Sequence, residues 1–386
     1  MTDTHSQDGP KRIAILGSTG SIGEQTLDMV RAHSERLSVV AVAAGHNAAR
    51  LTEQAAEFDV DLLALASEDA ATGLDVPGAQ VFAGADGICE LVEASDADLV
   101  IGAISGVAGL RPLMVALEAG IDCALANKEP LVAAGSLVTA TARNSGAALL
   151  PIDSEISAIF QCLRGEQSTE VERILLTASG GPFSKLSVEE LQQVTPERAL
   201  DHPTWRMGRK VTIDSATLAN KGFEVFEVRW MFNVDVRNIE VVVHHQSIIH
   251  SMVQFQDGSV IAQMGLPDMR VPIQFAIFYP DRVANDLPRM SLPEIGSLTF
   301  AEPDTERFPC LRLAFSAARA GRSYPAVLNA ADEVAVGAFL DGRIEFMRIP
   351  ELIERALEEH QAFAIDTLGD VEEADAWARG YVEDII

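Results

Sequence analysis

The chain has 386 residues, of which 48% are hydrophobic, and a formal net charge of −28 from 29 basic and 57 acidic side chains. A chain of this length and composition can bury sizeable cores in two or three domains. Binding along a nucleic-acid backbone needs clustered Lys and Arg, so the charge excludes a general nucleic-acid binder. A small anionic substrate would need a local basic pocket.

Four cysteines, at positions 89, 123, 162 and 310, show no CxxC spacing, and the first three lie among apolar residues. This pattern predicts buried, reduced thiols and a reducing compartment. The first ten residues are polar, and no later segment offers about 18 uninterrupted apolar residues. We therefore expect a cytoplasmic protein without a membrane segment.

The N-terminal region combines a short apolar run at residues 12–16 with Gly17-Ser-Thr-Gly-Ser-Ile-Gly23 and a helical pattern up to about residue 33. Glycines at this spacing let the backbone approach a pyrophosphate at a helix N-terminus, although a simple tight turn fits the same residues. Further apolar runs occur at 38–44, 61–66, 98–104, 122–126 and 147–150. Their alternation with helix-length segments predicts an α/β fold with a Rossmann-type doubly wound parallel sheet.

The end of the second predicted strand carries Gly45, His46 and Asn47, with Arg50 close by. Dinucleotide-binding folds that prefer NAD usually place Asp or Glu here, on the ribose 2′-hydroxyl. Because no acid would repel a 2′-phosphate, the sequence favours NADP.

Two charged clusters follow later predicted strands. Asn127, Lys128 and Glu129 come after one strand, at the edge where open α/β sheets bind ligands, or else form a helix cap and an exposed first turn. Asp153 and Glu155 follow another strand and would project to the same side of an extended chain. Carboxylates suit Mg²⁺ or Mn²⁺, whereas the alternative is a helix cap with an acidic first turn.

The pattern changes after residue 170, where a strand over 171–176 leads into a Gly-rich turn that includes Ser179. The hydroxyl and the neighbouring amides could hold a phosphate. The polar stretch 202–210 is long for a connection and includes Trp205, which either closes over a site or anchors a core.

A single helix is predicted over residues 214–224 and onward. Asn220, Lys221 and Glu224 fall in one sector of it, and an apolar stripe of Phe223, Phe226 and Trp230 lies on another side. The polar sector fits either a solvated surface with i,i+3 pairs or a site in which Glu224 joins Asp153 and Glu155.

The sequence after this helix predicts an antiparallel layer of strands at 241–243, 248–255 and 259–264, with a hairpin at Asp257-Gly258. His244, His245 and His250 match no common zinc spacing. Helical patterns at 310–320, 326–340 and 350–359 follow a Pro-rich stretch. We expect a dinucleotide-binding domain at 1–150, a catalytic domain at 151–280, a linker at 281–303 and a helical domain at 304–386.

Motifs at residues 17–23, 127–129, 151–155, 176–183, 207–210 and 214–224 together resemble the 1-deoxy-D-xylulose 5-phosphate reductoisomerase family, in the right order and over nearly the whole chain. The resemblance implies an N-terminal Rossmann-like domain, a central α+β catalytic domain that carries a homodimer interface, and a C-terminal helical domain. It implies that a sugar phosphate, 1-deoxy-D-xylulose 5-phosphate, rearranges by retro-aldol and aldol steps. NADPH then reduces the branched aldehyde to 2-C-methyl-D-erythritol 4-phosphate, an isoprenoid precursor.

The resemblance also implies roles for individual residues. Asp153, Glu155 and Glu224 would hold Mg²⁺ or Mn²⁺ and, with Lys128, form the catalytic group. The phosphate would be surrounded by Ser179, His202, Ser215, Asn220 and Lys221, while Ser154 and Lys128 would contact the rest of the substrate. NADPH would be bound by Thr19, Gly20, Ser21, Ile22, Gly45, His46, Asn47, Asn127, Glu129 and Gly208, and Trp205 and Met207 would belong to a closing flap.

The chain departs from the family pattern at a few places. His46 stands where a lysine is common, Ile156-Ser157 where His-Asn is common, and His245 where proline is usual. Two other functions remain open on the residues alone. A two-domain NADP-dependent dehydrogenase of a semialdehyde or sugar phosphate would explain the glycine loop but not three carboxylates, and a dinucleotide-sensing scaffold would leave the central motifs on the surface.

Overall fold

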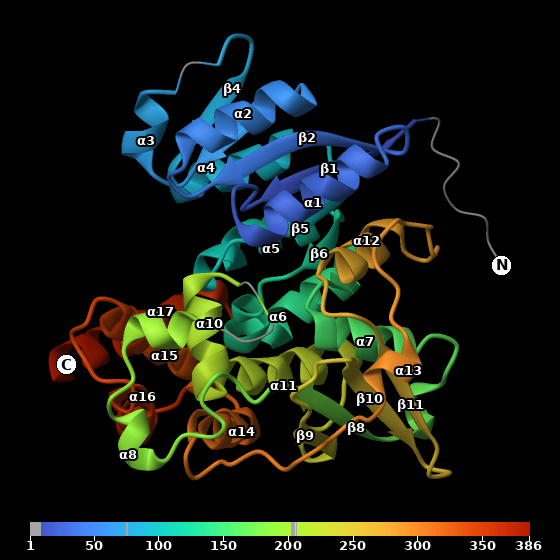
Figure 1. Cartoon of the computed structure of the whole chain (residues 1–386). Helices are drawn as coiled ribbons and strands as arrows, with labels where there is room; N and C mark the ends of the chain where they lie inside the picture. Colours follow the sequence, from blue (N-terminus) through green and yellow to red (C-terminus); the bar gives the residue numbers. More distant parts are fainter. Residues whose placement is uncertain (1–8, 75, 202–204, 206) are drawn as a thin grey trace. The chain divides into compact units, whose positions relative to one another are not determined.

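The computed structural model describes residues 9–74, 76–201, 205 and 207–386. The chain divides into two compact units, each built from three segments (Figure 1). The first comprises Met1–Asn127, Ala140–Asp153 and Met269–Ala284, and the second Lys128–Thr139, Ser154–Asp268 and Asn285–Ile386. Within the described ranges, no helix combines the length and hydrophobicity that crossing a bilayer requires.

The first unit contains a seven-stranded sheet in the order β4-β3-β2-β1-β5-β6-β7, in which all neighbouring strands are parallel. Its strands are β1 (Lys11–Leu16), β2 (Leu37–Ala44), β3 (Leu62–Leu65), β4 (Gln80–Ala83), β5 (Leu99–Gly102), β6 (Asp122–Leu125) and β7 (Leu149–Pro151). The chain runs outward from β1 in one direction and then returns to β5 on its other side, so the predicted doubly wound sheet is confirmed. The sequence did not indicate β4, a four-residue edge strand with only one buried side chain.

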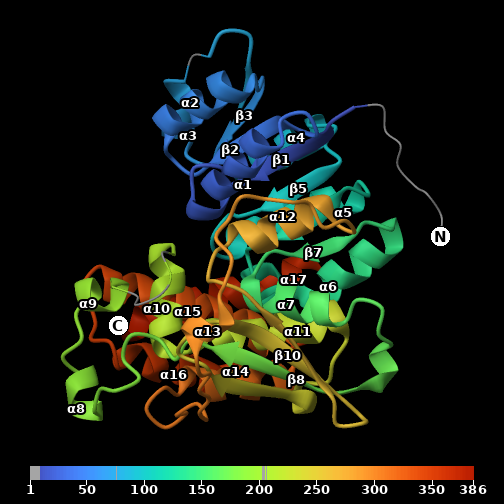
Figure 2. The same cartoon turned by 45° about the vertical axis from the view of Figure 1, so that its right-hand side comes forward.

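Helices connect these strands, and one of them comes from far along the chain. They are α1 (Ser21–Ala32), α2 (Ala48–Phe58), α3 (Glu68–Thr72), α4 (Gly84–Ala94), η1 (Val107–Gly109) and α5 (Leu110–Glu118), with α6 (Glu129–Ser145) shared between the units. The late helix α12 (Arg270–Phe278) contacts α1 and β7 (Figure 2). The Lys11 ammonium donates to the carbonyl of Ile277 at 2.9 Å, which ties α12 to the start of β1.

Close packing fixes the glycine loop between β1 and α1. Gly17 has φ +94°, and a Cβ there would lie 2.4 Å from the carbonyl oxygen of Ala103. A Cβ on Gly23 would lie 2.4 Å from the Gly17 oxygen and the Ser18 Cα. Both positions therefore exclude any side chain, since backbone atoms cannot move aside as a flexible side chain can.

Gly23→Ala should lower the free energy of unfolding by about 1–3 kcal/mol, the usual cost of overpacking. Gly73→Ala is the matched control, because no atom lies within 4 Å of its added Cβ. Chemical denaturation of both variants measures the difference. Equal midpoints for the two variants would contradict the close packing of the loop.

The second unit contains a four-stranded sheet in the order β11-β10-β8-β9. Its strands are β8 (Val171–Ala178), β9 (Ile239–Val243), β10 (Ile249–Phe255) and β11 (Val260–Met264). The hairpin between β10 and β11 is confirmed, and β10 also pairs antiparallel with β8. The expectation of a wholly antiparallel layer is wrong at one edge, where β9 runs parallel to β8 because α10 and α11 connect them.

The helices of the second unit form the rest of its core. They are α7 (Ser154–Cys162), η2 (Ser168–Glu170), α8 (Val188–Leu191), α9 (Pro196–Leu200), α10 (Arg209–Thr217), α11 (Ala219–Phe232), η3 (Val236–Asn238), α13 (Leu292–Ile295), α14 (Cys310–Ala320), α15 (Tyr324–Leu340), α16 (Arg348–Glu359) and α17 (Leu368–Ile385). The helical pattern after residue 304 is confirmed, with α17 as an addition that the sequence did not indicate. All four cysteines are free thiols, three of them buried.

The prediction of one helix over residues 214–224 is wrong. The chain breaks at Leu218, which has φ 62° and ends α10, and α11 starts at the next residue. The hydroxyl of Thr217 donates to the Asp214 carbonyl at 3.1 Å and accepts from the Ala219 amide at 3.3 Å, which stabilises the corner. A buried leucine in a left-handed conformation is unusual, and no glycine or proline in the sequence marks the break.

Candidate active site

Three carboxylates gather where β7 leads into α7. Asp153 is the residue at which the chain leaves the first unit, Glu155 lies in the first turn of α7, and Glu224 lies on α11. Each offers an oxygen, and these oxygens all lie within 4.8 Å of one another. Oxygen ligands at this separation fit a hard divalent cation such as Mg²⁺ or Mn²⁺.

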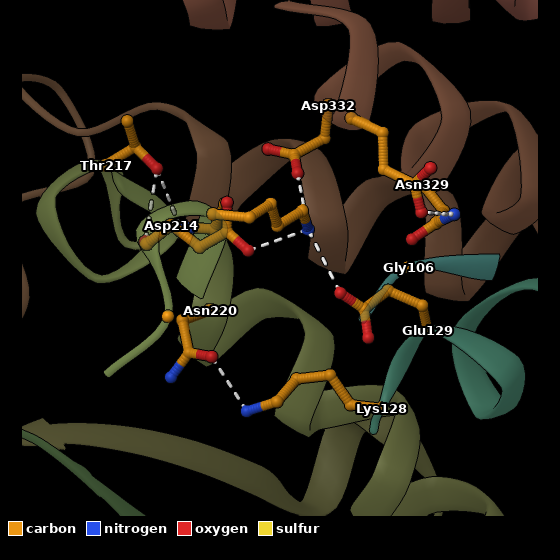
Figure 3. A network of polar contacts seen from close by, with 12 residues as sticks. Gly106, Lys128, Glu129, Asp214, Thr217, Asn220, Asn329 and Asp332 are labelled. Atoms are coloured by element: carbon orange, nitrogen blue, oxygen red, sulfur yellow. Dashed lines mark hydrogen bonds and ion pairs between the residues drawn. The ribbon is translucent and has the colours of Figure 1, made fainter. Parts of the chain in front are cut away.

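Two lysines face this carboxylate cluster. Lys221 pairs with Glu155 at 3.1 Å and with one oxygen of Glu224, while the Lys128 ammonium lies 3.3 Å from the other Glu224 oxygen. Lys128 also donates to the Asn220 side chain at 2.7 Å (Figure 3). Asn220 in turn donates to Glu224 at 2.7 Å. Glu224 has no exposed surface and Lys221 only 4%. A solvated helix face is thereby excluded, because these charges are buried and paired.

A loop after β8 lies against the C-terminal end of α10. The Gly181 amide donates to the Ser179 hydroxyl at 3.3 Å, and a Cβ on Gly181 would lie 2.7 Å from the Ser215 carbonyl oxygen. The segments of Ser179 and Ser215 are therefore in contact, as a shared phosphate site would need. His245 adds a contact that the sequence did not reveal, since its Nδ1 lies 2.7 Å from the Ser179 carbonyl oxygen.

The predicted flap is only partly described. His202 lies outside the described residues. Trp205 is half-buried, with its ring 6.2 Å from the ring of His250, and Met207 is also half-buried. Gly208 occupies the N-cap position of α10.

In the first unit, the predicted cofactor residues lie on loops after β1, β2 and β6. Residues 19–22 surround the N-terminus of α1, with Gly20 at the N-cap. Gly45, His46 and Asn47 are exposed after β2, and the Asn47 side chain caps α2 by accepting from the Arg50 amide. Asn127 donates to the Gly106 carbonyl at 3.2 Å. These loops share the carboxyl edge of the parallel sheet, where α/β folds bind ligands.

Arg50, which lies close to His46 in the sequence, is paired with two carboxylates. Its guanidinium pairs with Glu24 on α1 and with Glu53 on α2, each at 2.7 Å. Glu24 directly follows the glycine loop, and this pairing was not evident from a sequence separation of 26 residues. Neutralised by two carboxylates, Arg50 contributes little net positive charge near His46.

A second charged cluster surrounds Lys210 on α10. Its ammonium lies 2.7 Å from Asp214, 2.8 Å from Asp332 on α15 and 3.4 Å from Glu129, and the three carboxylates are all at least 97% buried. Burial and the neighbouring carboxylate raise the pKa of Asp214 well above its ordinary value, and burial also raises the pKa of Asp332. One ammonium thus balances only part of the negative charge.

Asp332→Asn should therefore stabilise the protein by about 1–3 kcal/mol near neutral pH, because it removes a buried carboxylate and keeps its shape. A carboxyl whose pKa is raised on folding holds its proton longer in the native state. Its contribution to stability falls as the pH rises from the unfolded pKa of about 3.9 through the raised native value.

Unfolding midpoints of the wild type and Asp332→Asn, measured between about pH 5 and pH 8, test whether the contribution of Asp332 to stability falls as the pH rises. The variant should lose less stability with rising pH, whereas the exposed control Asp341→Asn should follow the wild type. A variant less stable than the wild type across that range would refute the expectation.

Comparisons with known proteins cover almost the entire chain. Family models described as 1-deoxy-D-xylulose 5-phosphate reductoisomerase, its C-terminal domain, and DXP reductoisomerase C-terminal domain match residues 13–135, 149–232 and 264–381. The reductoisomerase of Heliobacterium modesticaldum is 53% identical, with 96% of each chain covered. That of Chlorobium limicola is 50% identical over 97% of this chain and its own full length.

Solved structures agree with these relatives. The reductoisomerase of Zymomonas mobilis in complex with NADPH is 39% identical, with a TM-score of 0.90 over 97% of this chain and 99% of its own. A DOX-P reductoisomerase in complex with NADPH, fosmidomycin and magnesium is 36% identical, with a TM-score of 0.92 over 97% of this chain and 98% of its own. The chain therefore belongs to the 1-deoxy-D-xylulose 5-phosphate reductoisomerase family and is an NADP-dependent oxidoreductase.

Proposed function

We propose that the protein converts 1-deoxy-D-xylulose 5-phosphate to 2-C-methyl-D-erythritol 4-phosphate by isomerisation followed by reduction with NADPH, within isoprenoid precursor synthesis. The observation that carries this proposal is the converging group of Asp153, Glu155 and Glu224, with Lys128 and Lys221 paired to its carboxylates. Glu224 is fully buried, and the other two carboxylates are half-buried. A dehydrogenase that only transfers hydride has no need for three converging carboxylates. A rearrangement that breaks and forms a carbon–carbon bond next to a carbonyl is assisted by a bound cation, which polarises the carbonyl and stabilises the charge that develops on its oxygen.

Asp153, Glu155 and Glu224 would hold Mg²⁺ or Mn²⁺, and their oxygen donors and spacing fit either ion. When bound, the ion would polarise the substrate carbonyl and stabilise negative charge that develops on its oxygens. Magnesium is present with NADPH and fosmidomycin in a related structure that is 36% identical.

Lys128 and Ser154 would contact the carbon chain of the substrate. The Ser154 hydroxyl donates to Glu155 at 2.6 Å, so it is already directed toward the carboxylate cluster. Lys128 is 5% exposed, and its ammonium donates hydrogen bonds to Asn220 and Glu224. These two bonds limit the positions that the ammonium can take. Such restriction favours a fixed position for the reacting carbons.

The phosphate would be bound by Ser179, His202, Ser215, Asn220 and Lys221. A chain of net charge −28 must provide a local cation for a phosphate dianion. Lys221 provides it, and the contact between the Ser179 loop and α10 supports two hydroxyls near the same group. Trp205 and Met207 would close over the bound substrate as a flap.

NADPH would be bound by Thr19, Gly20, Ser21, Ile22, Gly45, His46, Asn47, Asn127, Glu129 and Gly208. Gly20 and Ser21 are exposed at the N-terminus of α1, and backbone amides at a helix N-terminus suit a pyrophosphate. We also propose the domain division at residues 150, 280 and 303, a homodimer, and a cytoplasmic location.

Because Arg50 is paired with Glu24 and Glu53, we expect His46 rather than Arg50 to contact the 2′-phosphate. A lysine ammonium carries a full positive charge at every working pH. His46→Lys should therefore raise the ratio of kcat/KM for NADPH to that for NADH. An unchanged ratio would contradict this role.

The proposed function is tested by incubating the protein with 1-deoxy-D-xylulose 5-phosphate, NADPH and Mn²⁺ and following the loss of NADPH absorbance. Consumption should require the sugar phosphate and should stop when a chelator removes the metal. If NADPH binds but no substrate-dependent consumption occurs, the proposed function is wrong.

A further inference from the structure

Lys210 contacts four helices of the second unit through one ammonium group. It pairs with Glu129 at the start of α6, with Asp214 one turn along α10, and with Asp332 on α15. The same ammonium lies 4.4 Å from the centre of the Phe223 ring on α11. Figure 3 shows the carboxylates of Glu129, Asp214 and Asp332 turned toward this one group.

Glu129 directly follows Lys128, and both side chains of this dipeptide are held. The ammonium of Lys128 lies on α11, between Asn220 at 2.7 Å and Glu224 at 3.3 Å. The carboxylate of Glu129 lies 3.4 Å from Lys210 on α10. Since α10 and α11 meet at the Leu218 corner, the dipeptide is held on both sides of that corner.

We propose that Lys210 is a positioning residue for the reaction, because it holds Glu129 and so directs the Lys128 ammonium onto Glu224. This inference rests on the proposed function, in which Lys128 and Glu224 contact the substrate and the metal. Lys210 itself touches neither in this scheme, and it acts through Glu129.

The electrostatics of the Lys210 cluster agree with a fixed ammonium. Burial by itself would lower the pKa of Lys210, but Asp214, Asp332 and Glu129 together raise it well above its ordinary value. The thiol of Cys310 also faces Asp332 and Asp214, and burial keeps it protonated by raising its pKa. Glu333 adds negative charge beside Asp332. Lys210 therefore stays charged at any working pH.

Removing the ammonium would break the contact that joins Glu129 to α10, while Asp214 and Asp332, whose pKa values burial raises, would take up protons. The start of α6, where Glu129 is the first residue, would then no longer be held against α10 by Lys210, and Lys128 would shift with it. A displacement of about 1 Å at a reacting group commonly costs on the order of 100-fold in rate. Arginine keeps the charge but spreads it over a planar fork, so it should restore only part of the geometry.

The test compares Lys210→Met, Lys210→Arg and the exposed control Lys185→Met for kcat and thermal unfolding. We expect kcat per folded molecule to fall on the order of 100-fold in Lys210→Met, to recover partly in Lys210→Arg and to be unchanged in Lys185→Met. A Lys210→Met protein that is less stable but turns over normally when folded would show that Lys210 is only structural and would overturn the proposal.

A double-mutant cycle with Glu129→Gln tests the route of the effect. If Lys210 acts through Glu129, the double variant should lose no more activity than the more damaging single variant. Losses that multiply would show that Lys210 acts independently of Glu129, which would also overturn the proposal.

Crystal structures of the wild type and Lys210→Met test, without an activity measurement, whether Lys210 positions the Lys128 ammonium. The inference expects the Lys128 ammonium to leave its position beside Glu224 in the variant, and an unchanged position would refute it. A wild-type protein that fails to turn over would refute the proposed function, while this structural comparison would still test the positioning role.

Discussion

Glu224→Gln is expected to lower kcat on the order of 1,000-fold, the larger end of what removing one preorganised charged group costs. Glu224 is fully buried, and its two carboxylate oxygens form ion pairs, one with Lys128 and the other with Lys221. Glutamine keeps the size but offers a single acceptor oxygen and turns an amide group toward one of the lysines. A neutral side chain is also a much weaker ligand for Mg²⁺ or Mn²⁺.

The measurement is kcat and the Mn²⁺ dissociation constant, with NADPH binding as the check on folding. NADPH affinity should stay near that of the wild type, while Mn²⁺ binding weakens strongly. Glu240→Gln is the control, because Glu240 is a surface carboxylate of the same unit that pairs with Arg173. An active Glu224→Gln protein with ordinary metal dependence would refute the ligand role.

Lys221→Ala should change two affinities in opposite directions. Losing a charge-assisted contact should raise KM for the sugar phosphate about 10- to 100-fold. Mn²⁺ should bind more tightly, because the Lys221 ammonium lies 3.1 Å from Glu155 and also pairs with Glu224, so it competes with a cation for both carboxylates. If a metal binds to these carboxylates as proposed, it would release Lys221, which would then be available for the phosphate.

Steady-state kinetics in the sugar phosphate and titration with Mn²⁺ measure the two effects separately. Lys185→Ala, at an exposed position, should alter neither. If KM is unchanged in Lys221→Ala, the lysine does not contact the phosphate, and if Mn²⁺ binds more weakly, the competition is wrong.

The parallel sheet was predictable because parallel strands are buried on both faces and read as continuous apolar runs. Ile13, Ala14 and Ile15 have no exposed surface. The edge strand β4 lacks such a run, and the return of α12 to the first unit depends on contacts more than 200 residues apart, such as Lys11 with Ile277. No local pattern encodes contacts of that kind.

In the candidate site, too, local sequence patterns predict some features, whereas others depend on contacts between distant residues. Asp153 and Glu155 could be singled out because they follow a strand closely, and Glu224 because it shares a helix sector with Asn220 and Lys221 and lies in a motif of the family. The Leu218 corner was not predictable, since no glycine or proline marks it. The contacts of Lys210 with Glu129 and Asp332, and of Arg50 with Glu24, were not predictable because they join side chains from separate helices. Sequence spacing predicts neighbours along one helix or strand, whereas packing decides which helices meet.

The most direct measurement follows the carbon skeleton with 1-deoxy-D-xylulose 5-phosphate labelled with ¹³C at both carbon 3 and carbon 4. A retro-aldol step breaks the bond between these carbons, and the aldol step joins carbon 4 to carbon 2. We predict that the one-bond ¹³C–¹³C coupling of the substrate is absent from the NADPH-reduced product. A product that keeps this coupling would show reduction without rearrangement and would contradict the proposed function.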